Sequence, residues 1–273
     1  MGLSTYYELA KAEGVERTAK QREVVCIQGL GFVGIAVAIA SASRLDITGE
    51  PYFNVIGLDL PTDSGLEKIK HLNCGQFNVN CGDPTLKEAF EVVKNQGNIF
   101  ATDKNEALKI ADTVIVDVNL DLEALNDKPE VHFNNFIEAI RMVGRYCKPE
   151  TLIIVETTVP PGTCEKIVVP TIEDELLKRN LNKRCLCIAH AGERVMPGDG
   201  YLDSIINMWR VYAGLDAKAA EKCKIFLEKL INVKEYPLTQ VDSLTASETT
   251  KVLENSYRAV NIAFIEEWGR FAE

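Results

Sequence analysis

The stretch from residue 23 to residue 34, EVVCIQGLGFVG, joins a short apolar run to a glycine-rich turn. The run is rich in β-formers, and the small apolar residues after the turn, IAVAIASASR, favour a helix. Gly29, Gly31 and Gly34 have the G-x-G-x-x-G spacing. In that spacing the first glycine permits the turn, the second lets backbone approach a pyrophosphate, and the third lets helix pack on strand. Such turns also serve as plain connections, but the flanking strand and helix predict a dinucleotide site.

The next strand supplies the acid that a dinucleotide-binding turn requires. The run from 52 to 60, YFNVIGLDL, predicts a second strand whose end carries Asp59. An acid at about this distance from the glycines receives the ribose hydroxyls of the cofactor. Because no arginine directly follows Asp59, the sequence favours NAD over NADP.

Strands and helices alternate along the chain outward from this stretch. Further strands are predicted at 98–103, 112–118, 151–159 and 184–191, and helices at 65–75, from residue 103, at 133–147 and at 162–179. The run DTVIVDV at 112–118 is apolar almost throughout, as expected for a strand covered on both faces. The alternation predicts an α/β fold with a Rossmann-like, doubly wound parallel sheet.

Beyond residue 200 the pattern changes to longer helices. A helix is predicted near 216–231, a short strand at 232–237 (NVKEYP), and then one long helix that meets no proline after Leu238 and no glycine before Gly269. That helix would extend about 45 Å and is still running at the last residue, so we expect a truncated chain. The predicted parts are a helical leader (1–20), an NAD-binding domain (21–215) and a helical region (216–273).

Composition and charge exclude several classes of protein. The net charge of −10 argues against nucleic acid as a partner, and no segment is apolar enough to span a membrane or to act as a signal peptide. A cytoplasmic protein is therefore expected. The eight cysteines contain no C-x-x-C pair, so we expect reduced, mostly buried thiols and no metal site.

The long helix carries an unusual polar stripe. In KVLENSYRAVNIAF, residues 251–264, Lys251, Asn255 and Arg258 recur at i, i+4 and i+7, so they share one face of a helix that otherwise predicts burial. A lysine one turn before an asparagine can direct two hydrogen-bond donors at a developing oxyanion. The simpler alternative is a solvated face on which Lys251 and Arg258 pair with Glu254 and its neighbours.

Two further motifs end strands at the carboxyl edge of the predicted sheet, where open α/β sheets bind ligands. They are ETTVPPGT at 156–163 and AHAGERVMPG at 189–198. Together with GLGFVG, VIGLDL, ADTVIV, RVYAG and KVLENSYRAVNIAF, they make the chain resemble the UDP-glucose/GDP-mannose dehydrogenase family of nucleotide-sugar 6-dehydrogenases. Within it, the UDP-N-acetylglucosamine and UDP-N-acetylmannosamine enzymes look most similar, from about Val24 to the last residue.

The resemblance implies oxidation of a UDP-sugar CH₂OH group to a carboxylate by two NAD⁺. It implies that Thr158 holds a water or polar group near C6, that Glu193 assists thioester hydrolysis, and that Lys251 and Asn255 polarise the C6 oxygen, with Arg258 touching the substrate. The residues it assigns to the cofactor are Gly29, Gly31, Phe32, Val33, Gly34, Asp59 and Thr158.

Three departures from the family pattern are visible. VNLDL at 118–122 stands where the family has Thr-Pro, and Gly192 stands where it has proline. The family's nucleophilic cysteine follows the long helix and precedes a uridine-binding domain, and no cysteine here has that place. Cys164 begins a predicted helix, where a thiolate is favoured, but the family does not use that position. We therefore expect the N-terminal part of a longer enzyme.

Two other functions and one assembly remain open from the sequence. A 3-hydroxyacid dehydrogenase of the 6-phosphogluconate type also uses a lysine and an asparagine four apart, although its expected glycine is Ser247 here. A non-catalytic NAD-binding module is the other alternative. Leu253, Tyr257, Val260 and Phe264 form an apolar stripe that predicts either packing within the chain or, as in the family, a homodimer.

Overall fold

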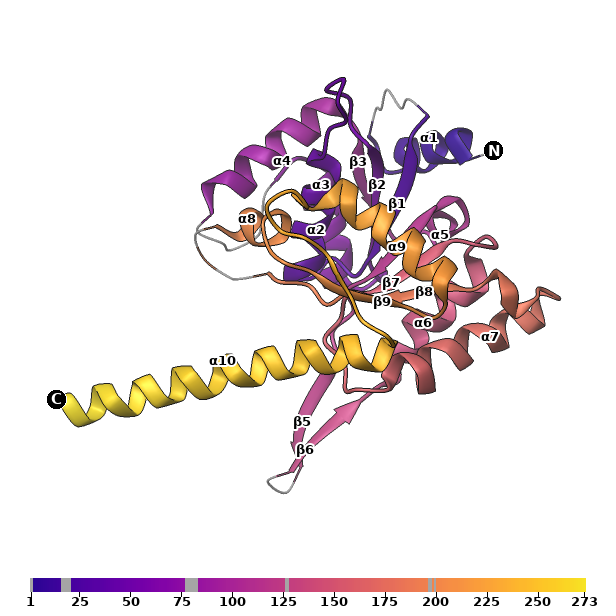
Figure 1. Cartoon of the computed structure of the whole chain (residues 1–273). Helices are drawn as coiled ribbons and strands as arrows, with labels where there is room; N and C mark the ends of the chain where they lie inside the picture. Colours follow the sequence, from indigo (N-terminus) through magenta and orange to yellow (C-terminus); the bar gives the residue numbers. More distant parts are fainter. Residues whose placement is uncertain (1, 16–20, 77–82, 126–127, 196–197, 199) are drawn as a thin grey trace.

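The structure, a computed structural model, describes all residues except 1, 16–20, 77–82, 126–127, 196–197 and 199. In the described chain a central sheet is covered by helices on both faces, and a long helix and a β-hairpin extend away from it (Figure 1). The eight strands of the sheet lie in the order β10-β9-β8-β7-β4-β1-β2-β3. The order reverses beside β1, and such a switch point is where doubly wound sheets bind their ligands.

The strands of the sheet are short and mostly buried. Their bounds are β1 (Glu23–Gln28), β2 (Phe53–Leu58), β3 (Ile99–Thr102), β4 (Thr113–Val116), β7 (Leu152–Val155), β8 (Cys187–His190), β9 (Val211–Gly214) and β10 (Thr239–Gln240). All neighbours pair in parallel except β8 and β9. The predicted Rossmann-like sheet is confirmed, with one antiparallel junction near its edge.

Helices form a layer on each face of the sheet. Their bounds are α1 (Gly2–Ala12), α2 (Phe32–Ser43), α3 (Asp63–Asn73), α4 (Pro84–Gln96), α5 (Glu106–Ile110), α6 (Asn134–Tyr146), α7 (Val169–Lys178), α8 (Tyr201–Ile206), α9 (Ala217–Leu230) and α10 (Leu244–Ala272). A π-helical turn, η1 (Cys164–Val168), precedes α7, and a 3₁₀ turn, η2 (Lys183–Cys185), precedes β8. One core lies beneath α2, α4, α8 and α9, and a second lies beneath α1, α5, α6 and α7. Because both faces are covered, the central strands are buried almost throughout and mostly apolar.

The predicted leader is a packed helix. Tyr6, Leu9 and Ala10 of α1 are buried, and the ring of Tyr6 meets that of Phe100 edge-to-face at 4.9 Å. Residues 16–20 of the predicted leader lie outside the described residues.

The prediction of a strand at 232–237 is wrong. The segment forms a tight turn in which the Tyr236 amide donates to the Asn232 carbonyl oxygen at 3.0 Å. Val233 and Tyr236 pack on the core from this turn, which explains their apolar spacing. The strands of this region are instead β9 and β10, on either side of α9 and the turn.

The hairpin of β5 (Asp121–Leu125) and β6 (Lys128–His132) is also not among the predicted elements. It begins just after β4, at the VNLDL departure, and projects past the sheet edge (Figure 1).

The predicted long helix exists, but most of it is not buried. α10 begins after Ser243, whose hydroxyl accepts from the Ala246 amide at 3.1 Å. Its buried residues are Leu244, Ser247, Glu248 and Lys251, and beyond them the helix extends away from the domain (Figure 1). The expectation of a largely buried helix is therefore wrong. None of the described helices meets the length and apolarity needed to cross a membrane.

Candidate active site

The glycine turn between β1 and α2 has the close contacts that its spacing predicts. Gly29 has φ of +99°, and a Cβ added there would lie 2.7 Å from the Asp117 carbonyl oxygen. A Cβ at Gly34 would lie 1.9 Å from the Gly29 carbonyl oxygen, so this glycine allows α2 to pack on the turn. A Cβ at Gly31 would meet nothing within 4 Å. The second glycine therefore faces open space, as it would where a phosphate approaches the backbone.

Asp59 lies beside this turn, just past the end of β2. Its carboxylate accepts from the Leu30 amide at 3.0 Å and the Leu60 amide at 2.8 Å, and it pairs with the Lys68 ammonium at 3.2 Å. These bonds fix the acid against the turn while 12% of its side chain stays exposed.

A cleft of about 870 Å³ lies over the carboxyl ends of β4 and β7. Its lining comes from α2, the segments after β4, β7 and β8, the hairpin and α10 and comprises Val33, Asp117, Asn119, Leu120, Val131, Glu156, Thr157, Thr158, Val159, Pro160, Pro161, Glu193 and Val252. Thr157 is buried, and its hydroxyl donates to the carbonyl oxygens of Val116 and Val118. The neighbouring Thr158 is exposed, so its hydroxyl is available in the cleft.

Lys251 reaches this cleft through Glu193. Its ammonium donates to the Glu193 carbonyl oxygen and lies 3.1 Å from Glu193 Oε1. The lysine passes directly over Gly192, where an added Cβ would lie 3.1 Å from Lys251 Cγ and Cδ. A proline at this position, as in the family pattern, would crowd the lysine stem, so the glycine is matched to this path of the side chain.

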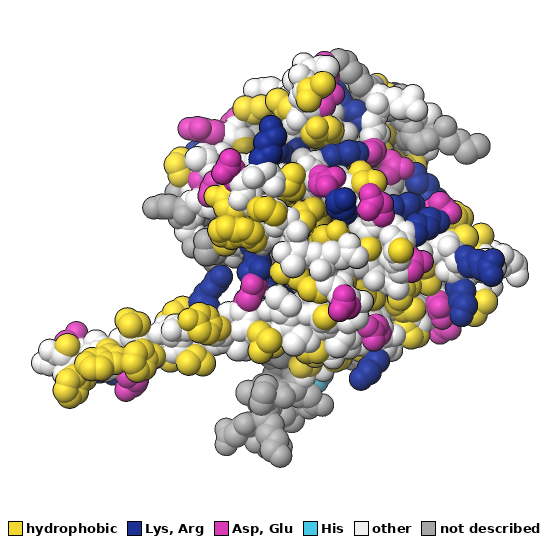
Figure 2. Space-filling view, in the orientation of Figure 1, with side chains coloured by type: hydrophobic (Ala, Val, Ile, Leu, Met, Phe, Trp, Pro, Cys, Tyr) yellow, Lys and Arg dark blue, Asp and Glu magenta, His cyan; other side chains and the backbone are white. Residues whose placement is uncertain are grey.

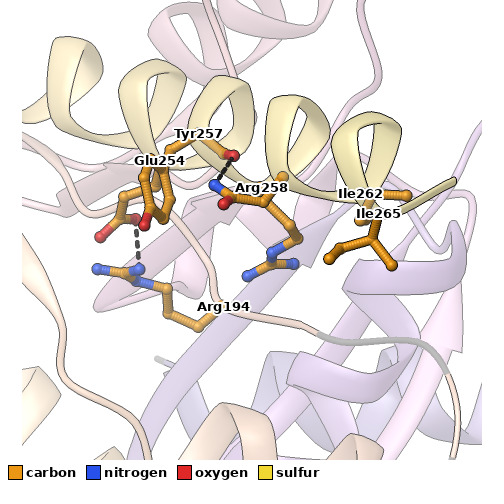
Figure 3. Close-up of a pocket in the computed structure, with 7 residues that line it drawn as sticks. Arg194, Glu254, Tyr257, Arg258, Ile262 and Ile265 are labelled. Atoms are coloured by element: carbon orange, nitrogen blue, oxygen red, sulfur yellow. Dashed lines mark hydrogen bonds and ion pairs between the residues drawn. The ribbon is translucent and has the colours of Figure 1, made fainter. Parts of the chain in front are cut away.

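Asn255 and Arg258 do not join Lys251 at the cleft. Both are exposed on α10, and neither lines the 870 Å³ cleft. Arg258 lines a neighbouring hollow of about 570 Å³ beneath α10, where its side chain descends from the helix while that of Arg194 turns toward Glu254 (Figure 3). Arg194 is ion-paired with Glu254. The predicted stripe is thus divided: Lys251 contacts Glu193, which lines the cleft, Arg258 lines the hollow, and Asn255 lines neither.

Glu248, which the sequence did not single out, and Ser247, which it named only for the hydroxyacid alternative, attach α10 to the sheet edge. The buried Glu248 carboxylate accepts from the Gly162 amide and, at 2.7 Å, from the Cys164 amide. The Ser247 hydroxyl lies 2.8 Å from His190 Nδ1 at the end of β8. Burial, and then the charge of Lys251, lowers the pKa of His190 from 6.5 to about 4, so this imidazole is neutral.

Cys164 is not a reactive thiolate, contrary to the expectation from its place at a helix start. The side chain is fully buried, and burial followed by the charge of Glu248 raises the pKa of its thiol well above the usual value. Glu248 occupies the helix N-terminus that would have stabilised a thiolate. All seven described cysteines are free and five are buried, whereas Cys81 lies outside the described residues.

Three buried charged residues beneath the cleft were also missed. The Arg210 guanidinium donates to Glu156 Oε1 at 2.9 Å, and both side chains are almost fully buried. Burial raises the pKa of Glu156 to about 6, against the opposing charge of Arg210. Burial, then the charges of Glu156 and Glu193, raises the pKa of Asp117 well above its usual range. An aspartate that directly ends the apolar run TVIV was the one signal in the sequence.

Residues 23–231 match the NAD-binding domain of the UDP-glucose/GDP-mannose dehydrogenase family. The chain belongs to this family. The match contains the glycine turn, Asp59, Thr158 and Glu193 and ends one residue after α9. The predicted resemblance is confirmed, and so is the assignment of an NAD-binding domain.

Relatives and solved structures of this family agree. The chain is 32% identical over 252 residues to UDP-N-acetyl-D-mannosamine dehydrogenase of Methanocaldococcus jannaschii. The alignment covers 91% of this chain and 51% of the relative. The structure of NDP-N-acetyl-D-galactosaminuronic acid dehydrogenase from Methanosarcina mazei has a TM-score of 0.77 and 27% identity, covering 98% of this chain and 53% of that one. The structure of UDP-D-ManNAc dehydrogenase from Pyrococcus horikoshii has a TM-score of 0.73 and 29% identity. That match covers 89% of this chain and 52% of the other. The chain thus spans about half the length of the relatives it matches.

Proposed function

We propose that this chain binds NAD⁺ as the cofactor-binding part of a nucleotide-sugar 6-dehydrogenase, which oxidises C6 of a UDP-linked hexose or N-acetylhexosamine to the uronate. One arrangement carries the proposal. The glycine turn, Asp59, Thr158 and the Lys251–Glu193 pair all lie along the carboxyl edge of one sheet. Ligands of doubly wound sheets bind at this edge.

The residues present fit an NAD cofactor. The open space at Gly31, next to the N-terminus of α2, suits a pyrophosphate, because backbone N–H groups and the helix dipole favour an anion there. The exposed oxygen surface of Asp59 suits ribose hydroxyls, and it would repel the 2′-phosphate of NADP. When bound, the cofactor supplies the hydride acceptor. Phe32, Val33, Gly29 and Gly34 would shape its binding surface.

We assign Lys251 to stabilising negative charge on the C6 oxygen and Glu193 to accepting a proton there. The ammonium of Lys251 lies 3.1 Å from the Glu193 carboxylate. Lys251 is only 9% exposed. A fixed cation in a poorly solvated site stabilises negative charge that develops on a substrate oxygen. Glu193 can accept a proton from a water held by Thr158.

The substrate side of the site is proposed to lie along α10. Asn255 would add a donor to the C6 oxygen, and Arg258 beside Arg194 offers guanidinium groups that suit the anionic part of a nucleotide sugar. The names of the relatives favour a UDP-N-acetylhexosamine over other nucleotide sugars. A second copy of the chain, packed against the exposed stripe of α10, is the proposed partner.

The hydroxyacid dehydrogenase alternative is less supported. The residues match a nucleotide-sugar dehydrogenase domain, and Ser247, the position where the hydroxyacid enzymes have glycine, is buried against His190. The non-catalytic alternative predicts NAD⁺ binding without turnover even after the family's C-terminal domain is supplied in trans, and NADH formation under that condition would exclude it.

The experiment is titration of the full chain with NAD⁺ by calorimetry, followed by a Gly31→Val variant. We expect NAD⁺ to bind the unchanged chain and its affinity to fall at least about tenfold in the variant, because the new side chain would fill the space of the pyrophosphate. A Gly269→Ala variant is the control, since a Cβ there also meets nothing within 4 Å. A chain that binds no NAD⁺ would overturn the proposal. Formation of NADH with UDP-N-acetylmannosamine would then test turnover.

A further inference from the structure

Two acidic residues, Asp117 and Glu156, directly follow paired strands at the floor of the cleft, and each has a buried carboxylate oxygen without a hydrogen-bond partner in the described chain. β4 and β7 pair in parallel with Val116 opposite Val155, so the next residues, Asp117 and Glu156, follow on adjacent strands and on the same face. Both line the cleft and are at least nine-tenths buried. Asp117 Oδ2 and Glu156 Oε2 are buried atoms that lack a hydrogen-bond partner in the described chain.

An unpaired buried carboxylate oxygen is costly, so the pair requires an explanation. Neighbouring carboxyl groups in a poorly solvated site cannot both ionise easily and commonly share a proton. Such a proton would halve the negative charge that the two acids bring into the buried site. Burial favours it first, because it raises the pKa of both Asp117 and Glu156; the charge of Glu156 further raises the pKa of Asp117, and that of Glu193 raises both.

In the described part of the chain, three charged groups outside the pair act on it. Glu193 comes from the segment after β8, Arg210 from the residue before β9 and Lys251 from α10. With every group ionised, three carboxylates oppose two cations. One proton on the pair, or one positively charged ligand in the cleft, balances the site.

With NAD bound as proposed, the sheet order would place the nicotinamide end of the cofactor over this pair. Asp59 marks the adenosine end beside β2, and the glycine turn marks the pyrophosphate beside β1. Because β4 and β7 follow on the other side of β1, the remaining half of a bound dinucleotide would continue toward their ends. The nicotinamide ring is positively charged in NAD⁺ and neutral in NADH.

We propose that Asp117 and Glu156 form a proton-sharing pair that responds to the redox state of the nicotinamide. The pair loses its proton to solvent when NAD⁺ binds, and it keeps the proton when NADH binds. The ionised pair then attracts the pyridinium ring, so the cleft prefers the oxidised cofactor. This inference rests on the proposed binding of NAD in this cleft.

Calorimetry in two buffers of different ionisation enthalpy at pH 7 tests the proposal, because the difference in heat counts the protons released. We expect NAD⁺ to release up to about one proton per chain and NADH to release close to none. The affinity for NAD⁺ should rise between pH 6 and pH 8, since the ionised pair binds the cation better, while the affinity for NADH should not.

An Asp117→Asn variant should bind NAD⁺ without releasing a proton, and the preference for NAD⁺ over NADH should fall about tenfold. Asp112→Asn is the matched control, because Asp112 lies just before the opposite end of β4 and pairs with Lys148 outside the cleft. It should leave proton release unchanged. Equal proton release with NAD⁺ and NADH in the unchanged chain would overturn the inference, with no variant needed. Failure of NAD⁺ to bind would instead overturn the proposed function.

Discussion

His190 is a neutral imidazole enclosed between β8 and α10. Its ring contacts the Ser247 hydroxyl, and its pKa is lowered from 6.5 to about 4 by burial and by Lys251. A lowered pKa means that the imidazole stabilises the fold above pH 6.5, and that this contribution is lost as the pH falls toward 4. The shift corresponds to about 3 kcal/mol of unfolding free energy.

The unfolding free energy should therefore fall by about 3 kcal/mol more between pH 7 and pH 4 in the unchanged chain than in a His190→Asn variant. Urea denaturation at the two pH values measures this difference. Ser247→Ala is the control, because it removes the contact but leaves the imidazole buried, so its pH dependence should resemble that of the unchanged chain. An identical loss in all three chains would contradict the assignment.

Residues of the site differ in how far the sequence could locate them. The glycine turn and Asp59 are local, because the spacing of a few residues and the end of one strand define them. The Lys251–Glu193 pair joins residues 58 positions apart, and only the resemblance brought them together. The Glu156–Arg210 and Glu248–Cys164 contacts also join residues far apart in the sequence. No short sequence pattern predicts which buried acid accepts from which donor.

At the scale of elements, α10 is fixed to the domain by its first two turns. Glu248 accepts two amide hydrogen bonds from the turn after β7, and both amides are buried with it. Since Lys251 follows one turn later, this attachment also sets where the lysine reaches Glu193. Glu248 is thus a positioning residue for the site.

A Glu248→Ala variant should lower the unfolding free energy by about 2–4 kcal/mol, because two buried amides lose their acceptor. Glu248→Gln should lose less, since its carbonyl oxygen can still accept one of the two bonds. Glu266→Ala on the exposed part of α10 should leave stability nearly unchanged. Thermal or urea unfolding followed by circular dichroism compares the three, and an unchanged midpoint for Glu248→Ala would refute the positioning role.

Elements were predictable where the chain repeats one pattern over several residues. The central strands are continuous apolar runs because both faces are covered, and they were located correctly. β9 is buried only at its two middle residues and β10 has two exposed residues, so neither is a fully buried apolar run like the four-residue strands of the centre. The sequence of the turn at 232–237 resembles that of a strand, because two of its residues are apolar and pack on the core.

At the scale of the whole molecule, the two ends of α10 have different roles: its start contributes to the candidate active site, and the rest is a candidate association surface. The first turns of the helix enter the site, whereas its remaining length carries large apolar side chains into solvent (Figure 2). Six of them recur at i, i+4, i+7, i+11, i+15 and i+18 and form one stripe of Leu253, Tyr257, Val260, Phe264, Trp268 and Phe271. Each is at least 54% exposed. A stripe of this size is unusual on the surface of a lone domain.

We predict that two copies of the chain bury this stripe against each other. Covering a large apolar side chain contributes about 1.5–3 kcal/mol, so six on each copy can hold a dimer together. Sedimentation velocity should give twice the 30.3 kDa chain mass, and a Phe264→Glu, Trp268→Glu double variant should give the mass of one chain, because charges would have to be buried. Glu266→Lys, on the opposite side of the helix, should remain dimeric. A monomeric unchanged chain at tens of micromolar would show that something other than a second copy covers the stripe.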